Sequence, residues 1–155
     1  MATILRALIV EDSEYDTQTM LRELRRGGYE VEYERVETRS AMEQALSERT
    51  WDLILCDYTL PRFSAGDALR TLQQSGLDLP FIIISGTIEE EHAVDMLKAG
   101  AHDFIVKGRM ARLLPAIERE LKDAQTRRLQ REAEVQRQEL MARLEAINSE
   151  IERFT

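Results

Sequence analysis

Five short runs of apolar and β-branched residues recur along the chain, and this repeat limits its fold more than any other feature. The runs cover residues 4–10, 31–36, 52–56, 80–85 and 103–107. Runs of this length, bounded by turn signals, are typical of β-strands. The intervals between them have the apolar spacing of helices. Alternating strands and helices predict an α/β domain, with a parallel sheet that is covered by helices on both faces.

Four helices are predicted in the intervals, and glycines at 27–28, 76 and 100 end three of them. Their apolar faces are marked by Thr19, Met20 and Leu24; by Met42, Ala45 and Leu46; by Leu69 and Leu72; and by Val94 and Leu97, followed by Lys98. One common strand order for such a doubly wound, flavodoxin-like sheet is 2-1-3-4-5, and its functional crevice lies beyond the carboxyl ends of the strands. We therefore expect the functional residues directly after the strands.

Acidic, hydroxyl and basic side chains occupy these positions. Glu11 and Asp12 follow the first run and Asp57 follows the third, while Ser85 and Lys107 come at the ends of the fourth and fifth. Strands one and three are neighbours in the expected order, so the three acids should converge. Clustered carboxylates stay ionised only beside a cation, and Mg²⁺ prefers oxygen ligands of this kind. The sequence therefore predicts a Mg²⁺ site with Lys107 as a further positive charge.

The predicted site suits phosphoryl transfer. A carboxylate can attack phosphorus and form an aspartyl phosphate. The transfer depends on positioning and on neutralising the equatorial phosphoryl oxygens, which Mg²⁺, Lys107 and the Ser85 hydroxyl could do together. An ionised Asp57 needs no general base because it has no proton to lose. The predicted catalytic residues are therefore Asp57, Lys107 and Ser85.

Two rival classes of site fit this sequence poorly. The loop EDSEYD after the first run lacks the glycines of a nucleotide-binding loop. A haloacid-dehalogenase-like phosphatase would carry its nucleophile on the first strand and a second Asp two residues later. This chain has Asp12 and then Glu14 at those places, which argues against that class.

Four segments together resemble the receiver domain of response regulators. They are LIVEDS (8–13), ILCDYTLPRFSAGDAL (54–69), PFIIISGT (80–87) and AVDMLKAGAHDFIVK (93–107). Their order and spacing make the resemblance specific, and it extends from residue 4 to about residue 122. It implies that a histidine kinase or a phosphotransfer protein phosphorylates Asp57. A domain of this kind catalyses only its own phosphorylation and dephosphorylation.

The resemblance also implies how the metal would be held. Mg²⁺ would bind Asp12, Asp57 and the backbone carbonyl of Thr59, and Glu11 would complete the acidic pair through water. Thr59 further matches a family position that tunes the lifetime of the acyl phosphate.

Ser85 and Phe104 match the hydroxyl and aromatic switch residues of the family. Phosphate would draw Ser85 inward, and Phe104 would follow into the vacated space. This movement would alter the face made by the fourth helix, the fifth strand and the fifth helix.

One position departs from the family pattern. Receivers usually follow the matching lysine with proline in a cis peptide, whereas this chain has Lys107-Gly108. A cis bond without proline costs about 2.5 to 4 kcal/mol, so the peptide could be trans, and glycine should leave the loop freer. In having a residue other than proline at this position, the chain resembles a subset of receivers that are often fused ahead of sensor or kinase modules. It is also the one support for an alternative, a phosphorylation-independent pseudo-receiver that acts as a dimerisation or interaction module.

The last third of the chain predicts one long helix from Met110, in which Pro115 is tolerable only if it falls in the first turn. Near its end, the helix carries an apolar stripe with heptad spacing, which we call the heptad seam. It consists of Leu140, Leu144, Ile147, Ile151 and Phe154. Arg and Gln interrupt the seam earlier, which indicates a weak or stuttered coiled coil. A lone helix cannot bury such a stripe, so we expect a parallel homodimer.

These features predict a receiver domain at residues 1–122 and a coiled-coil signalling helix at residues 123–155. The end of the chain, LEAINSEIERFT (144–155), resembles the segment before the phosphoacceptor histidine box of dimeric histidine kinases. We therefore expect a fragment whose parent continues into a kinase or another dimeric output module.

Composition and charge limit which partners and which cellular compartment are expected for the protein. The net charge is −8, and residues 1–108 carry 11 basic against 20 acidic side chains, so nucleic-acid binding is not expected. The lone Cys56 suggests a buried thiol in a reducing compartment. With His92 and His102 scattered and expected to be exposed, no Cys/His metal cluster is predicted. No apolar run reaches membrane-spanning length. We expect a cytoplasmic protein without membrane contact, in which Trp51 is a packing residue.

Overall fold

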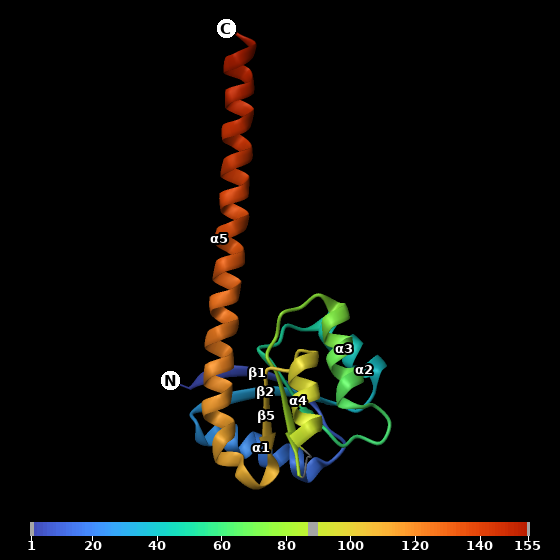
Figure 1. The fold of residues 1–155 in the computed structure, drawn as a ribbon. Coiled ribbons are helices and arrows are strands. Elements are labelled where there is room, and N and C mark those ends of the chain that lie inside the picture. Colours follow the sequence, from blue (N-terminus) through green and yellow to red (C-terminus); the bar gives the residue numbers. More distant parts are fainter. Residues whose placement is uncertain (1, 87–89, 155) are drawn as a thin grey trace. The chain divides into compact units, whose positions relative to one another are not determined.

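The computed structural model describes residues 2–86 and 90–154, and they form alternating strands and helices (Figure 1). The elements in chain order are β1 (Thr3–Val10), α1 (Glu14–Arg26), β2 (Tyr29–Val36), α2 (Arg39–Glu48), β3 (Leu53–Asp57), α3 (Ala65–Ser75), β4 (Phe81–Ser85), α4 (Glu90–Ala99), β5 (Asp103–Val106), the 3₁₀ segment η1 (Lys107–Arg112) and α5 (Leu113–Arg153). The five predicted strands and the helices between them are all present.

The five strands form one parallel sheet in the order β2-β1-β3-β4-β5. This confirms the predicted doubly wound, flavodoxin-like fold. The register aligns Val10 with Cys56 and Asp57 with Ile84. The carboxyl ends of β1, β3 and β4 therefore meet at one edge of the sheet, where the candidate site lies.

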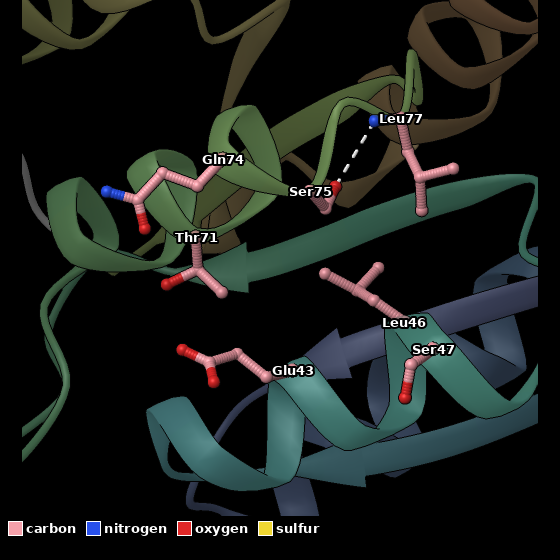
Figure 2. Close-up of a pocket in the computed structure, with 7 residues that line it drawn as sticks. All are labelled: Glu43, Leu46, Ser47, Thr71, Gln74, Ser75 and Leu77. Carbon is pink, nitrogen blue, oxygen red and sulfur yellow. Dashed lines mark hydrogen bonds between the residues drawn. The ribbon is translucent and has the colours of Figure 1, made fainter.

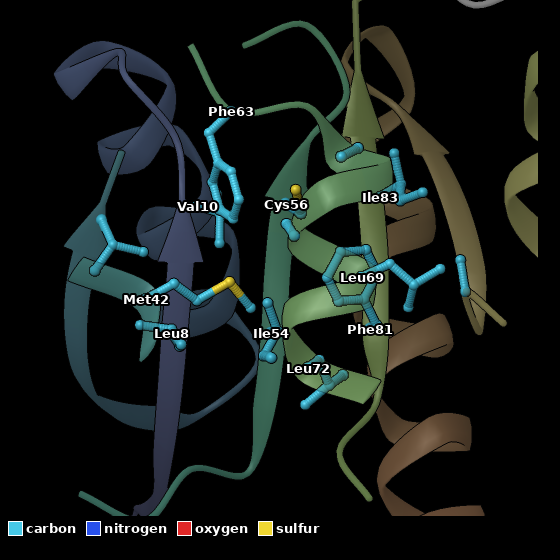
Figure 3. Close-up of a cluster of buried hydrophobic side chains, with 14 of the residues drawn as sticks. Leu8, Val10, Met42, Ile54, Cys56, Phe63, Leu69, Leu72, Phe81 and Ile83 are labelled. Atoms are coloured by element: carbon cyan, nitrogen blue, oxygen red, sulfur yellow. The ribbon is translucent and has the colours of Figure 1, made fainter. Parts of the chain in front are cut away.

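Each face of the sheet packs against its own layer of helices. One buried cluster joins β1, β3 and β4 to α2, α3 and α4, and Figure 3 shows Phe81 and Ile83 among its members. The other joins the opposite sheet face to α1 and to the first turns of α5, through Leu113 and Ile117. Every residue of β3 and β4 is buried, as expected for central strands that are covered on both faces. The polar ends of these strands are therefore held on a rigid frame.

Three helices begin with the same capping arrangement. The side-chain oxygens of Ser13, Thr38 and Ser64 each accept the backbone N–H three residues later, which satisfies one of the free amides at a helix start. Gly76, which follows α3, has a φ of 76°, in the left-handed region that glycine favours. The helices α1, α3 and α4 end directly before the glycines at 27, 76 and 100, as predicted.

The predicted apolar face of α4 is wrong. Val94 and Leu97 were expected to pack, but they are 41% and 43% exposed. Met96 is buried instead, and Ala93, one turn before it, is half-buried. Ala93 and Met96 lie three residues apart, so they share a face as effectively as Val94 and Leu97 do. Val94 and Leu97 together are larger than Ala93 and Met96, and for that reason the sequence pattern favoured the face that is in fact exposed.

The predicted start of the last helix at Met110 is also corrected. Residues 107–112 form a 3₁₀ segment, in which Arg109 has the non-helical angles φ −129° and ψ 51°. The α-helix begins at Leu113, which places Pro115 in its first turn, where proline is tolerated.

The chain divides into two compact units, Met1–Leu121 and Lys122–Thr155. The second unit is helical through Arg153, and its large apolar side chains are exposed. These include Leu129, Val135, Leu140, Met141, Leu144, Ile147, Ile151 and Phe154. Within residues 2–86 and 90–154, no helix has a stretch long and apolar enough to cross a membrane.

Candidate functional site

Three carboxylates meet at the edge of the sheet where β1 and β3 end. Glu11 and Asp12 directly follow β1, and Asp57 is the last residue of β3. One carboxylate oxygen from each of the three lies within 4.8 Å of the others. Glu11 and Asp57 are buried, whereas Asp12 is exposed. The structure thus brings together the three acids that the strand pattern placed at one edge.

Glu11 is the most deeply buried member of the acidic cluster. Its Oε1 accepts the backbone N–H groups of Asp12, at 3.1 Å, and Ser13, at 3.0 Å. Its Oε2 has no hydrogen-bond partner among the described residues. Burial raises the pKa of Glu11 to about 7, although the Ser13 amide opposes the shift; the nearby Asp57 carboxylate raises the pKa and Lys107 lowers it. A nearby cation therefore favours the ionised form of Glu11.

The pKa of Glu11 predicts how stability depends on pH in metal-free buffer. Between pH 4.5 and about 7, the folded protein keeps a proton on Glu11 that the unfolded chain has released. The free energy of unfolding should therefore fall as the pH rises through this interval. Urea denaturation in the presence of a chelator would measure this fall. The Glu11→Gln variant, which cannot titrate, should show a flatter curve, and an equal slope in both proteins would contradict the prediction.

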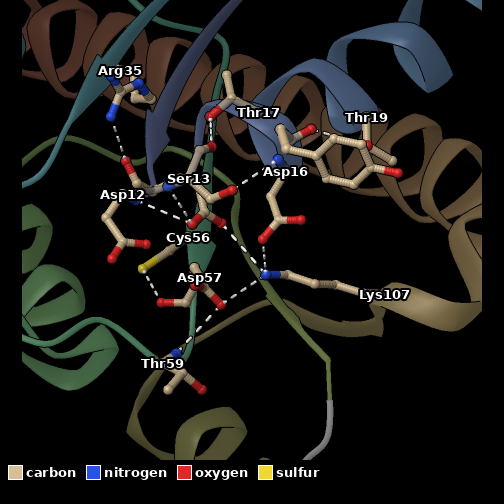
Figure 4. Close-up of polar contacts among 12 residues, drawn as sticks. Asp12, Ser13, Asp16, Thr17, Thr19, Arg35, Cys56, Asp57, Thr59 and Lys107 are labelled. Atoms are coloured by element: carbon tan, nitrogen blue, oxygen red, sulfur yellow. Dashed lines mark hydrogen bonds and ion pairs between the residues drawn. The ribbon is translucent and has the colours of Figure 1, made fainter.

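Lys107 places its ammonium among the acids (Figure 4). Its Nζ lies 2.7 Å from Oδ2 of Asp16, 3.5 Å from Oδ1 of Asp57 and 3.7 Å from Oε2 of Glu11. Burial lowers the pKa of Lys107, but the Asp16 hydrogen bond and the neighbouring carboxylates outweigh it, and the net shift is upward. The lysine is therefore a fixed positive charge at the site.

The peptide bond between Lys107 and Gly108 could be cis or trans by sequence, and the structure shows which. No peptide bond in the described part of the chain is cis, so Lys107-Gly108 is trans. The segment continues as the 3₁₀ turn η1. A Cβ placed on Gly108 would meet no atom within 4 Å. Neither proline geometry nor close packing at residue 108 holds Lys107 in place.

The other predicted residues lie around the acidic cluster. The backbone N–H of Thr59 donates to Oδ1 of Asp57 at 3.3 Å. Ser85 is fully buried at the end of β4, one residue past Ile84, the register partner of Asp57. Phe104 is partly buried on β5 and packs against the cluster under α2, α3 and α4. All of these predicted site residues belong to the first compact unit.

Arg35, a residue that was not predicted, contacts the loop of acids. It lies in β2 and donates from Nη1 to the backbone carbonyl of Glu11 at 3.3 Å. The same nitrogen pairs with Glu37 at 2.8 Å. An arginine in an exposed edge strand gives no sequence signal of this contact, because only the pairing of β2 with β1 brings it there.

The two histidines have structural contacts that the sequence did not indicate. His102 was expected to be exposed, but it is partly buried, and its Nδ1 accepts the backbone N–H of Phe81 at 3.0 Å. His92 is exposed as expected, and its ring stacks on Tyr58, the residue after Asp57, with centroids 5.8 Å apart. Neither residue belongs to the acidic cluster.

Hollows in the described part of the chain show where a ligand could approach, and two of the larger ones differ in whether the clustered acids line them. One, of about 420 Å³, lies between α2 and α3 and is lined by Glu43, Leu46 and Thr71 among others (Figure 2). It contains none of the clustered acids. The other, of about 330 Å³, is lined by Asp12, Glu37, Leu60, Pro61 and Arg62. The second hollow opens beside the acids and is the approach that matters for their chemistry.

The donor set fits a hard divalent cation. Three carboxylates supply oxygen ligands at close range, and the buried Oε2 of Glu11 has a lone pair that no donor in the described residues satisfies. Mg²⁺ binds through one or two carboxylates and keeps several waters. Asp12 is exposed, so an ion bound there would remain open to solvent and could keep its waters.

Comparison with known proteins agrees with the observed fold. A family model described as the response regulator receiver domain matches residues 7–118. The chemotaxis protein CheY of Bacillus subtilis is 32% identical over 117 residues, which cover 75% of this chain and 97% of that protein. CheY of Thermotoga maritima is 30% identical over 102 residues, or 66% of this chain and 84% of that protein.

Solved structures share the same architecture. The signal receiver domain of a LuxO repressor protein from Vibrio parahaemolyticus has a TM-score of 0.71 and 28% identity, covering 81% of this chain and 95% of that one. The receiver domain of the sensor histidine kinase PA1611 from Pseudomonas aeruginosa, solved with a magnesium ion in its active-site cleft, has a TM-score of 0.63 and 24% identity, covering 76% and 98%. By its strand order and its family match, this chain belongs to the response regulator receiver domains.

Proposed function

We propose that this domain is a cytoplasmic phosphoacceptor that receives a phosphoryl group on Asp57 from a histidine kinase or a phosphotransfer protein. One observation carries the proposal: Oδ1 of Asp57 lies 3.5 Å from Nζ of Lys107, inside a cluster of three carboxylates. Such a cluster combines a nucleophile with the charges that a phosphoryl group needs.

The transfer follows from the chemistry of these groups. A carboxylate oxygen of Asp57 attacks the phosphorus of a phosphohistidine, and an oxygen–phosphorus bond forms. The phosphorus–nitrogen bond breaks, and its electron pair stays on the imidazole, which leaves neutral when its other nitrogen carries a proton. Lys107 donates to a phosphoryl oxygen, and the Ser85 hydroxyl donates to another.

Asp12, Asp57 and the backbone carbonyl of Thr59 would hold Mg²⁺, with Glu11 acting through water. When bound, the ion supplies positive charge to the phosphoryl oxygens. The close carboxylates and the unsatisfied Oε2 of Glu11 support this assignment. So does the magnesium ion in the PA1611 receiver, a protein of the same fold.

A small phosphodonor tests the proposed function without the partner kinase. Incubation with acetyl phosphate and Mg²⁺ should add one phosphoryl group to the intact mass of the protein, and a chelator should prevent the addition. Asp57→Asn should stay unmodified, because an amide is a poor nucleophile. Asp67→Asn, which removes an exposed acid from α3, should be modified like the parent protein. An unmodified parent protein would sink the proposal.

The phosphoryl group would be read out through Ser85 and Phe104. The hydroxyl of Ser85 would move toward the phosphoryl oxygens, and the ring of Phe104 would shift with it. The partial burial of Phe104 supports this role, because a ring that is not fully enclosed by the core can change its position more easily than a fully buried one. The face made by α4, β5 and the start of α5 would change as a result.

The helix of the second unit would pass the signal on as a parallel homodimer. Its heptad residues Leu140, Leu144, Ile147 and Ile151 are 48–57% exposed in the single chain, and pairing with the same segment of a second copy would bury them. The output that it would reach is a kinase-like module, in agreement with the resemblance of residues 144–155 to the segment before a histidine box.

The pseudo-receiver alternative is not favoured. Its one support was the glycine after Lys107, yet Nζ of Lys107 still lies 3.5 Å from Asp57 in the trans geometry. This alternative requires the same dimer population with and without a phosphodonor.

A further inference from the structure

The shortest contact of the Lys107 ammonium is with an acid outside the candidate metal ligands. Oδ2 of Asp16 lies 2.7 Å from Nζ, closer than Asp57 at 3.5 Å or Glu11 at 3.7 Å. Asp16 lies in the first turn of α1, 91 residues away in the chain. An ammonium has three N–H donors, so the hydrogen bond to Asp16 leaves two of them for Asp57 and Glu11.

Lys107 needs such a contact because its own backbone does little to orient it. The side chain is a flexible four-carbon chain. The peptide that follows is trans, and Gly108 is free of close neighbours. Packing encloses the side chain only in part, since 25% of its surface is exposed. The position of Nζ is therefore set by its carboxylate partners.

Asp16 is well placed to act as that partner. Its backbone N–H donates to Oγ of Ser13 at 3.1 Å, and the hydroxyl of Thr17 donates to the Ser13 carbonyl at 2.9 Å. Both bonds fix the first turn of α1 to the loop that carries Glu11 and Asp12. Asp16 therefore holds the lysine from the same rigid segment that presents two of the acids.

A simpler explanation would make Asp16 only a helix-start acid. Negative side chains are favourable in the first turn of any helix, and Asp67 of α3 has the same place, three residues after the capping Ser64. Asp67, however, pairs with Arg70 of its own helix. The preference for an acid in the first turn explains why Asp16 is tolerated. It does not explain why Asp16 pairs with Lys107, which follows β5, the edge strand on the far side of the sheet.

We infer that Asp16 is a positioning residue, which takes one N–H of Lys107 and directs the other two toward Asp57 and Glu11. Its effect on phosphoryl transfer rests on the proposed function of Asp57, but its effect on the lysine does not.

The first test observes the ammonium directly. The chain has three lysines, and Lys98 and Lys122 are exposed, so their ammonium protons should be lost to exchange with water. A ¹⁵N-resolved NMR spectrum of the parent protein should show one ammonium signal, which Lys107→Ala removes. Asp16→Asn should also lose it, while Asp67→Asn should keep it. A signal that persists in Asp16→Asn, or that is absent from the parent protein, would overturn the inference.

The second test measures coupling between the two residues. Asp16→Asn should slow phosphorylation of Asp57 by acetyl phosphate about tenfold at saturating Mg²⁺, because a misplaced donor no longer meets the phosphoryl oxygen. In a Lys107→Ala background the same change should cause no further loss. Asp67→Asn should not change the rate, and Asp16→Glu should restore part of it. An equal loss in both backgrounds, or no loss in either, would reject the positioning role. If the parent protein takes up no phosphoryl group, the proposed function fails and the NMR comparison alone decides the inference.

Discussion

Replacing Lys107 with alanine should slow the phosphorylation of Asp57 by about a hundredfold. The ammonium lies 3.5 Å from the attacking carboxylate, where negative charge develops on the transferred group. Removing one well-placed donor from such a site typically costs about two to three orders of magnitude in rate. The loss should persist at saturating Mg²⁺, because an ion held by the carboxylates would not replace the hydrogen-bond donor that Lys107 supplies.

The rate is measured from the intact mass of the protein over time with acetyl phosphate. Lys98→Ala is the matched control, since Lys98 is an exposed lysine in the last turn of α4. Its rate should equal that of the parent protein. A Lys107→Ala protein that is phosphorylated at the parent rate would show that the ammonium has no part in the transfer.

Placing a charge in the heptad seam should convert the proposed dimer to a monomer. Ile147 is 52% exposed in the single chain and lies in the middle of the seam. An Ile147→Asp change would bring two carboxylates into the apolar core of the paired helices, where unpaired charge is strongly unfavourable. Sedimentation equilibrium should then give about half of the parent mass.

Ser149 supplies the control for this change, because it lies two residues further on and outside the seam. Ser149→Asp adds the same charge to the same helix turn and should leave the dimer intact. If both variants have the mass of the parent protein, the helix does not pair through this stripe.

The sheet could be predicted from the sequence because its pattern is redundant. β3 and β4 are buried on both faces, so their residues are apolar up to the last one, which is Asp57 in β3 and Ser85 in β4. The face of α4 could not be predicted in the same way. Met96 packs together with the small Ala93, whereas Val94 and Leu97, which have the same spacing on the helix, stay exposed.

The acids of the candidate site could be predicted because strand order alone brings them together. Glu11, Asp12 and Asp57 follow strands that are neighbours in any sheet of the order 2-1-3-4-5. Asp16 could not be predicted, since its sequence context matches that of Asp67, an ordinary helix-start acid. Only the path of the chain after β5 brings Lys107 to one of these two acids and not to the other.

The central claim, that Asp57 accepts a phosphoryl group, is tested most directly at the residue itself. After treatment with acetyl phosphate and Mg²⁺, borohydride reduces an aspartyl phosphate to homoserine, and peptide mass spectrometry locates the reduced residue. The proposed function predicts homoserine at position 57 and unchanged aspartate at positions 12 and 16. Aspartate alone at position 57, or homoserine at another acid, would contradict it.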